Sequence, residues 1–164
     1  MKYDATKLAS ISAVIEHDLA AIVKLDNQLS QLLEELQGEN PSFPTGAATA
    51  YILHNLYNAL ENSFTQISRT FENHIVNQTQ WHKELMDKMF LEIPNVRPAL
   101  LPETLRKMLN DLRGFRHVFR HSYDFELDPI LLLRIVERWQ NQKTELFDAL
   151  NEFHRFLQKD IGGT

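Results

Sequence analysis

Apolar residues recur every three or four positions over most of this chain, which is the spacing of one face of an α-helix. The first such stretch covers residues 4–37, and no proline or glycine interrupts it before Gly38. Its apolar row consists of Leu8, Ile11, Ile15, Leu19, Ile22, Leu25, Leu29, Leu32 and Leu36. At about 1.5 Å per residue this helix would be about 50 Å long. We expect it to act both as the spine of the fold and as a contact between subunits.

Two prolines and a glycine in residues 38–44 end the first pattern, and a second helical pattern follows them. We expect this second helix to begin near Thr45, acting as its N-cap, and to run to about Asn77. Its predicted buried face consists of Tyr51, Leu56, Leu60, Phe64, Ile67, Phe71 and Ile75.

A short third helix is predicted from Trp81 to Phe90, with Thr79 as its cap. Its residues Leu85 and Met89 would face inward. A loop that contains two prolines follows it, before the next helical pattern begins.

The fourth and fifth helices each have a start signal in the sequence. Pro102 occupies a favourable first helical position, with Glu103 in the first turn of the fourth helix. Asp128 as cap and Pro129 at the first position mark the start of the last helix. The apolar row of that last helix is Ile135, Trp139, Leu146, Leu150, Phe153 and Leu157.

No stretch alternates with a period of two over a length sufficient for a strand. The pattern therefore predicts an all-α fold, an up-and-down bundle of four main helices and one short helix. The chain has 164 residues, which is enough to bury a real core, and we expect one domain over residues 1–164.

Composition and charge indicate the cellular compartment and the half of the chain that could contact nucleic acid. It has no cysteine, which excludes disulfides and thiolate chemistry and favours an intracellular protein. No apolar run approaches the roughly 18 residues of a membrane span, so we expect a cytoplasmic protein without a membrane partner. The net charge is −5, but residues 1–96 carry 6 Lys/Arg against 12 Asp/Glu, whereas residues 97–164 carry 11 against 10. Any contact with nucleic acid should therefore lie in the second half.

The most unusual stretch is residues 113–123, which carry three arginines, two histidines and a tyrosine. A helical projection places five cationic or titratable residues on one side, namely Arg113, Arg116, His117, Arg120 and His121. An apolar row beside them, Leu112, Phe115 and Phe119, can hold the helix on a core. A cationic edge on a packed element suits an anionic partner, and histidine adds a group that titrates near neutral pH.

Three interpretations of this stretch follow from the residues. A metal site is the first, because His117 and His121 are four positions apart and Asp124 and Glu126 follow; the three arginines, however, would repel a divalent cation. In the second, Arg116 and His121 flank a phosphate group at the helix end, completed by a second subunit. In the third, the cations only complement the helix dipole and Tyr123 packs as a lid.

Other chemistries have less support in the sequence. No glycine-rich loop follows a strand, and no nucleophile motif indicates a Ser–His–Asp triad. The pair Trp81 and His82 is typical of a packed aromatic residue with a histidine at its rim. The remaining histidines are interpreted as ordinary surface or core positions; these are His17, His54, His74 and His154.

The spacing Arg116-x4-His121-x-Tyr123 resembles the R-x4-H-x-Y motif of HEPN-domain toxins, specifically the HepT-like ribonucleases. The segment from Tyr57 to Phe64 also resembles the second helix of that family, and the similarity extends over most of the chain from about residue 50. The position after the motif arginine is usually Asn or Asp in the family, whereas here it is His117.

The resemblance implies a metal-independent endoribonuclease that needs no cofactor and acts as a homodimer, with both motifs facing across the two-fold axis. His121 would be the general base or acid and Arg116 would hold the phosphate, while Arg113, His117 and Arg120 would bind the RNA backbone. These residues would act on tRNA or mRNA.

The resemblance also implies control within a type VII-like toxin–antitoxin pair. A minimal nucleotidyltransferase antitoxin would add AMP to Tyr123 and so neutralise the toxin. An alternative is a non-catalytic helical partner of a nucleotidyltransferase, in which the same edge binds a nucleotide or phosphate. A helical module that only docks a protein is a third interpretation.

Overall fold

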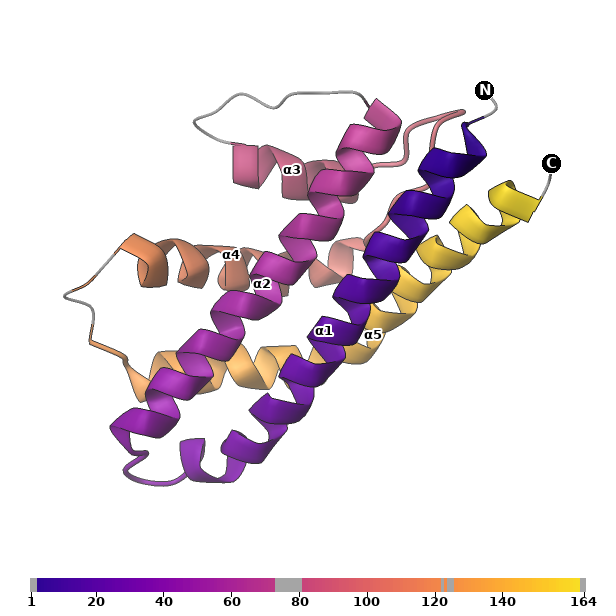
Figure 1. Ribbon diagram of the computed structural model, residues 1–164. Helices are drawn as coiled ribbons and strands as arrows, with labels where there is room; N and C mark the ends of the chain where they lie inside the picture. Colours follow the sequence, from indigo (N-terminus) through magenta and orange to yellow (C-terminus); the bar gives the residue numbers. More distant parts are fainter. Residues whose placement is uncertain (1–2, 73–80, 122, 124–125, 163–164) are drawn as a thin grey trace.

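The described part of the chain folds mainly into α-helices (Figure 1). The computed structural model describes residues 3–72, 81–121, 123 and 126–162. Its helices are α1 (Ala5–Leu36), α2 (Phe43–Glu72), α3 (Trp81–Met89), the 3-10 helix η1 (Glu103–Leu105), α4 (Arg106–His121) and α5 (Pro129–Gly162). No strand occurs in these parts of the chain, apart from one isolated bridge between Ile93 and Arg97. The predicted all-α class, with four main helices and a short one, is confirmed.

The two N-terminal helices run side by side in opposite directions, and α5 lies along α1 (Figure 1). Helix α4 crosses behind α2 in this view and also packs on α5. One hydrophobic cluster joins the five α-helices, and its fully buried members include Ile15, Leu56, Met86, Leu112 and Trp139. Burial of this apolar surface is the main favourable term in folding. No helix in the described residues is long and apolar enough to cross a membrane.

Two buried acidic residues of α1 connect it to its neighbours. Asp18 accepts a hydrogen bond from the hydroxyl of Ser63 in α2, at 2.7 Å. Asp26 accepts one from the indole nitrogen of Trp139, at 2.8 Å, and pairs with Lys143 at 2.9 Å. A buried carboxylate needs such partners, because an unpaired one would be costly to desolvate. These contacts fix α1 against both α2 and α5.

The start of α2 differs from the prediction. The helix begins at Phe43, two residues before the expected cap Thr45. Ser42 takes the capping role, because its hydroxyl accepts from the backbone N–H of Thr45 at 3.3 Å. Pro44 fits in the first turn, where its missing N–H would have no helical partner. The prediction that Thr45 caps the helix was therefore wrong.

The buried face of α2 is also shifted at its start. Tyr51, predicted to be buried, is 62% exposed. Ile52 and Leu53 occupy the inward positions instead, four and three residues before the buried Leu56. The predicted helix end near Asn77 lies outside the described residues, as do Ile75 and Thr79.

Two of the other start signals can be compared with the structure. Pro102 precedes the 3-10 helix η1 as its N-cap, and α4 begins only at Arg106, so Pro102 is not a first helical residue. The backbone N–H of Ile130 bonds to the Asp128 carboxylate at 2.9 Å. Asp128 therefore caps α5 as predicted, with Pro129 at its first position.

A buried arginine organises the segment that leads from α3 to α4. Arg97 donates to Glu72 of α2 through Nε at 3.2 Å, and its Nη atoms donate to the backbone carbonyls of Lys88, Leu91 and Pro98. These hydrogen bonds compensate the desolvation of the buried Arg97 guanidinium and hold the segment between α3 and η1 against α2.

Candidate functional site

Helix α4 is held in place by the apolar row that the sequence predicts. Leu112 and Phe115 are buried, and Phe119 packs against the core. The rings of Phe115 and Phe119 are 5.8 Å apart, and Phe119 also contacts the ring of His54 in α2 at 5.3 Å. The predicted row is confirmed, and it fixes which α4 residues face α2.

The cationic edge of α4 does not form one continuous surface. Arg113 and Arg116 are partly buried, whereas His117, Arg120 and His121 are exposed. Arg113 donates to Asn110 on its own helix at 3.2 Å. Arg116 contacts α2, so packing covers one part of an edge whose other residues stay exposed.

Arg116 is anchored by two residues of α2. Its Nε donates to Oδ1 of Asn58 at 2.6 Å, and its Nη2 forms an ion pair with Glu61 at 3.5 Å. Its side chain is 13% exposed. A guanidinium has five N–H donors, and these two contacts use only the side edge formed by Nε and Nη2. The outer edge, formed by Nη1 and Nη2, keeps donors for an anion.

Glu61 lies between two nitrogen groups. Its Oε1 pairs with Arg116, and its Oε2 lies 2.6 Å from Nδ1 of His82 in α3. The His82 ring packs against that of Trp81, with centroids 3.9 Å apart. Burial and the Glu61 charge also raise the pKa of the nearby Tyr57 hydroxyl. The phenol of Tyr57 therefore stays protonated at neutral pH.

His54 is a third polar residue of α2 in this cluster, beside Asn58 and Glu61. Its Nε2 lies 3.0 Å from Nδ2 of Asn58, the residue that accepts from Arg116. Burial, followed by the charges of Arg116 and Arg120, lowers the pKa of the His54 imidazole. At neutral pH His54 is therefore uncharged. The row of His54, Asn58 and Glu61 repeats at helical spacing, so one face of α2 presents all three to α4.

The other two motif residues are exposed. The ring of His121 lies 4.8 Å from that of His117 one turn earlier, and both residues are accessible. Tyr123 is fully exposed, so the interpretation in which Tyr123 packs as a lid is wrong. Arg116 is directed to α2 and makes no hydrogen bond or ion pair with His121. Within one chain, the motif residues thus lie at the same end of α4, but Arg116 does not contact His121 by a hydrogen bond or ion pair.

The residues of the proposed metal site are only partly described. His117 and His121 lie side by side, but Asp124 is outside the described residues. Within the described part, no group of three His, Asp or Glu side chains is arranged to hold a metal ion.

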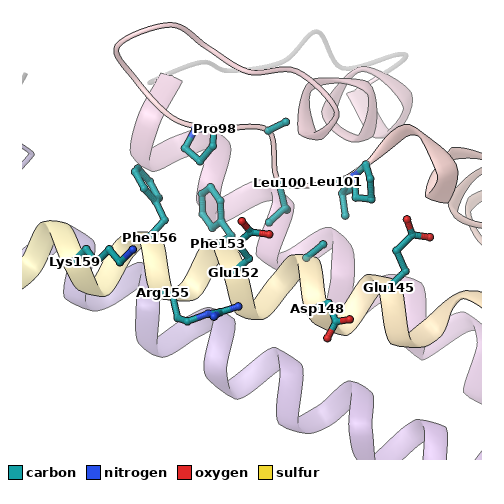
Figure 2. A pocket seen from close by; sticks show the side chains of 13 residues that line it. Pro98, Leu100, Leu101, Glu145, Asp148, Glu152, Phe153, Arg155, Phe156 and Lys159 are labelled. Atoms are coloured by element: carbon teal, nitrogen blue, oxygen red, sulfur yellow. The ribbon is translucent and has the colours of Figure 1, made fainter.

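A separate hollow of about 680 Å³ lies between residues 98–102 and the C-terminal half of α5 (Figure 2). Buried Leu100 and Phe153 line it together with charged residues of both signs, such as Glu152 and Arg155. No motif residue lines this hollow. It lies beside the start of α4, whereas the motif lies at the opposite end of that helix.

The sequence analysis missed the residues that hold Arg116. His54 was interpreted as an ordinary position and His82 as a rim histidine beside a packed Trp81, yet both histidines belong to the hydrogen-bonded cluster around Arg116. His74 lies outside the described residues. Asn58 and Glu61 fall in the segment that resembles the family's second helix. Polar residues at helical spacing within an otherwise apolar helix were the available signal, since buried polar groups require partners.

One of three comparisons with known proteins found a match. A search of curated proteins and a search of solved structures each found no significant match. The sequence model of one family, described as HepT-like protein, matches residues 48–157, which is more than half of the 164-residue chain. The matched segment includes the row on α2, the whole of α4 and most of α5. This chain therefore belongs to the HepT-like family.

Proposed function

We propose that this protein is a metal-independent endoribonuclease and the toxin of a toxin–antitoxin pair. The observation that carries the proposal is an arginine anchored on α2, Arg116, at the same helix end as two accessible imidazoles in a chain of the HepT-like family. An anchored guanidinium suits the recognition of phosphate, and histidine suits proton transfer at neutral pH.

The proposed chemistry uses these groups in one step. His121 removes the proton from a ribose 2′-hydroxyl as that oxygen attacks the adjacent phosphorus. The bond from phosphorus to the 5′-oxygen breaks, and a second, protonated imidazole gives its proton to that leaving oxygen. The products are a 2′,3′-cyclic phosphate and a 5′-hydroxyl. Arg116 stabilises the additional negative charge of the transition state through its outer N–H edge.

The second imidazole has two possible sources in this proposal. His117 lies 4.8 Å from His121 within one chain. A second subunit would supply another, because we propose a homodimer whose two motif stretches line one cleft. The separation of Arg116 from His121 within a chain supports this arrangement, since a facing copy would provide the missing neighbour.

The cationic residues near the motif would extend the binding surface. Arg120 is exposed beside the histidine pair, and Arg113 lies one turn before Arg116. We assign both, together with His117, to contacts with the RNA backbone, whose phosphates attract such cations.

Control of the toxin is assigned to Tyr123. Its side chain is fully exposed, so a minimal nucleotidyltransferase antitoxin can reach the hydroxyl. Transfer of AMP from ATP to this oxygen releases pyrophosphate and leaves a phosphodiester close to Arg120. Its negative charge would occupy the position of an RNA phosphate and block cleavage.

The experiment that tests the proposal is RNA cleavage in excess chelator by the wild-type protein and by His121→Ala. The matched control is His17→Ala, which removes an exposed imidazole from α1. We expect cleavage by the wild type and the control, and none by His121→Ala. Full activity in a folded His121→Ala variant would contradict the assignment. Nucleotide binding without cleavage by the wild type would favour the non-catalytic partner of a nucleotidyltransferase.

A further inference from the structure

The amide of Asn58 is oriented by the groups on its two sides. Its oxygen accepts from Nε of Arg116 at 2.6 Å, and that nitrogen can only donate. The Asn58 amide nitrogen must therefore be the atom that lies 3.0 Å from Nε2 of His54. If the amide were turned over, its NH2 group would face the N–H of Arg116, and both contacts would be lost.

This orientation determines where the proton of His54 lies. The amide nitrogen of Asn58 is a donor, so Nε2 of His54 must accept and cannot carry a hydrogen. A neutral imidazole carries one N–H, which leaves it on Nδ1. That nitrogen is buried and has no hydrogen-bond partner among the described residues. An unpartnered buried donor costs free energy. The hydrogen bonds from Asn58 to His54 and from Arg116 to Asn58 require this tautomer nevertheless.

We infer that His54 and Asn58 are positioning residues for Arg116, acting as a hydrogen-bonded relay from α2. Neutral His54 holds the Asn58 amide, and the Asn58 oxygen holds the side edge of the guanidinium. The outer edge of Arg116 then faces the phosphate of RNA in a fixed orientation. The functional part of this inference rests on the proposed ribonuclease activity, whereas the relay itself does not.

The charged groups that face His54 keep the relay intact. They are Arg116 and Arg120, both from α4, and the ring of Phe119 from the same helix covers the imidazole. Two neighbouring cations and burial all disfavour a charged imidazole. Protonation of Nε2 would place two donors against each other and release Asn58. Acid conditions should therefore free Arg116 from its orientation.

The relay is tested by NMR of the full-length protein labelled with 15N. Long-range imidazole spectra should show His54 as the Nδ1–H tautomer. Finding the Nε2–H tautomer would overturn the inference. Asn58→Asp should raise the pH at which His54 titrates, because a carboxylate can accept from Arg116 but cannot donate to His54. The matched control is Asn55→Asp, which makes the same change one turn earlier on α2 and should leave the tautomer unchanged.

Positioning of Arg116 is tested with two substitutions of His54. His54→Gln keeps an acceptor for Asn58, whereas His54→Leu removes it. The Nε–H of Arg116 should exchange with water faster in His54→Leu and remain protected in His54→Gln, and this readout requires no enzyme activity. Equal exchange in the two variants would overturn the positioning role.

Measurements of RNA cleavage distinguish a failure of this inference from a failure of the proposed function. His54→Leu should lower kcat/KM for RNA by about tenfold, as expected for a misplaced binding group, and His54→Gln should restore it. If the wild type cleaves no RNA, the proposed function fails, and the tautomer and exchange results still decide the relay. If the wild type cleaves RNA and both variants match it, positioning by His54 is wrong.

Discussion

The carboxylate of Glu61 accepts a hydrogen bond from Nδ1 of His82, 2.6 Å away, although the two residues belong to different helices. The other oxygen of Glu61 pairs with Arg116 at 3.5 Å. One buried acid thus joins α2 to both α3 and α4. A buried carboxylate is tolerated where cationic groups and hydrogen bonds compensate its desolvation.

Removal of this junction should destabilise the protein. Glu61→Ala leaves Arg116 and His82 without their shared partner and should reduce the free energy of unfolding by about 2–4 kcal/mol. Glu61→Gln should cost less, because its amide can accept from Arg116 and donate to His82. Urea unfolding of both variants measures the difference, with Glu84→Ala on the exposed side of α3 as control. An Ala variant as stable as the control would contradict this role.

The pair of Glu72 and Arg97 should make stability depend on pH in acid. Burial alone would raise the pKa of the Glu72 carboxyl, but hydrogen bonds and charge from Arg97 and then Lys88 bring it below its ordinary value. Its contribution to stability is therefore fully present above the pKa of an unfolded glutamate, and it is lost as the pH falls through the lower pKa of the folded state.

Urea unfolding between about pH 6 and about pH 3 measures this contribution. The wild type should lose more stability over this range than Glu72→Gln. Glu103→Gln serves as the control, because Arg106 also lowers the pKa of Glu103 but that pair is exposed and screened by water. Identical pH profiles for the wild type and Glu72→Gln would exclude a role for this pair.

Gly114 offers a stabilising substitution in α4. Apart from its two chain neighbours and the nearby backbone of its own helix, a Cβ built on Gly114 would meet no atom of the described residues within 4 Å. Glycine in a helix costs about 0.5–1 kcal/mol relative to alanine, because it loses more backbone freedom on folding. Gly114→Ala should therefore raise the free energy of unfolding by about that amount. Thermal and urea unfolding measure this change, and a loss of stability in Gly114→Ala would contradict the prediction.

Tyr123 should be the residue through which the antitoxin acts. Incubation with the cognate nucleotidyltransferase, ATP and Mg²⁺ should add AMP to Tyr123 and stop RNA cleavage. Tyr123→Phe should remain folded and escape inactivation. Tyr51→Phe is the matched control, because Tyr51 is also exposed but lies on α2. Mass spectrometry maps the modified residue, and AMP found only at other positions would refute the mechanism.

Val118 provides a test of the proposed dimer. It is 38% exposed and lies between His117 and His121 on α4. If the motif stretches face each other, Val118→Glu should separate the subunits at micromolar concentration, as measured by light scattering. Val23→Glu on α1, where the valine is 43% exposed, leaves the motif stretch unchanged and tests the expected contribution of α1 to the subunit contact. Dissociation by Val23→Glu alone would place the interface on α1 instead.

The helices could be predicted from the sequence because each buries a long apolar row. The row from Leu8 to Leu36 repeats over about eight helical turns, so its period outweighs the helix preference of any single residue. The start of α2 was misplaced, because the cap was assigned to Thr45, a residue type that suits this position. The structure selects Ser42, the residue that precedes both Phe43 and Pro44. Helix ends depend on such local competition, and periodicity does not decide it.

The candidate site could be predicted only in part. Arg116, His121 and Tyr123 were found from their spacing on one stretch of chain. Their surroundings depend on how α4 crosses α2, which places Arg116 beside Asn58, a residue 58 positions away. A helical projection contains no information on that crossing. It therefore grouped Arg116 with His121, whereas packing directs the arginine to α2.

Helix α1 lies outside the segment that matches the family, yet it contributes to the hydrophobic core. The family match begins at residue 48, after α1 has ended at Leu36. Yet α1 supplies the acid that binds Trp139 and a row of leucines and isoleucines to the same core as α2 and α5. The boundary of family resemblance is thus not the boundary of cooperative folding. A fragment trimmed to the matched segment would expose the apolar surfaces of α2 and α5 that α1 covers, and it should aggregate when it is expressed.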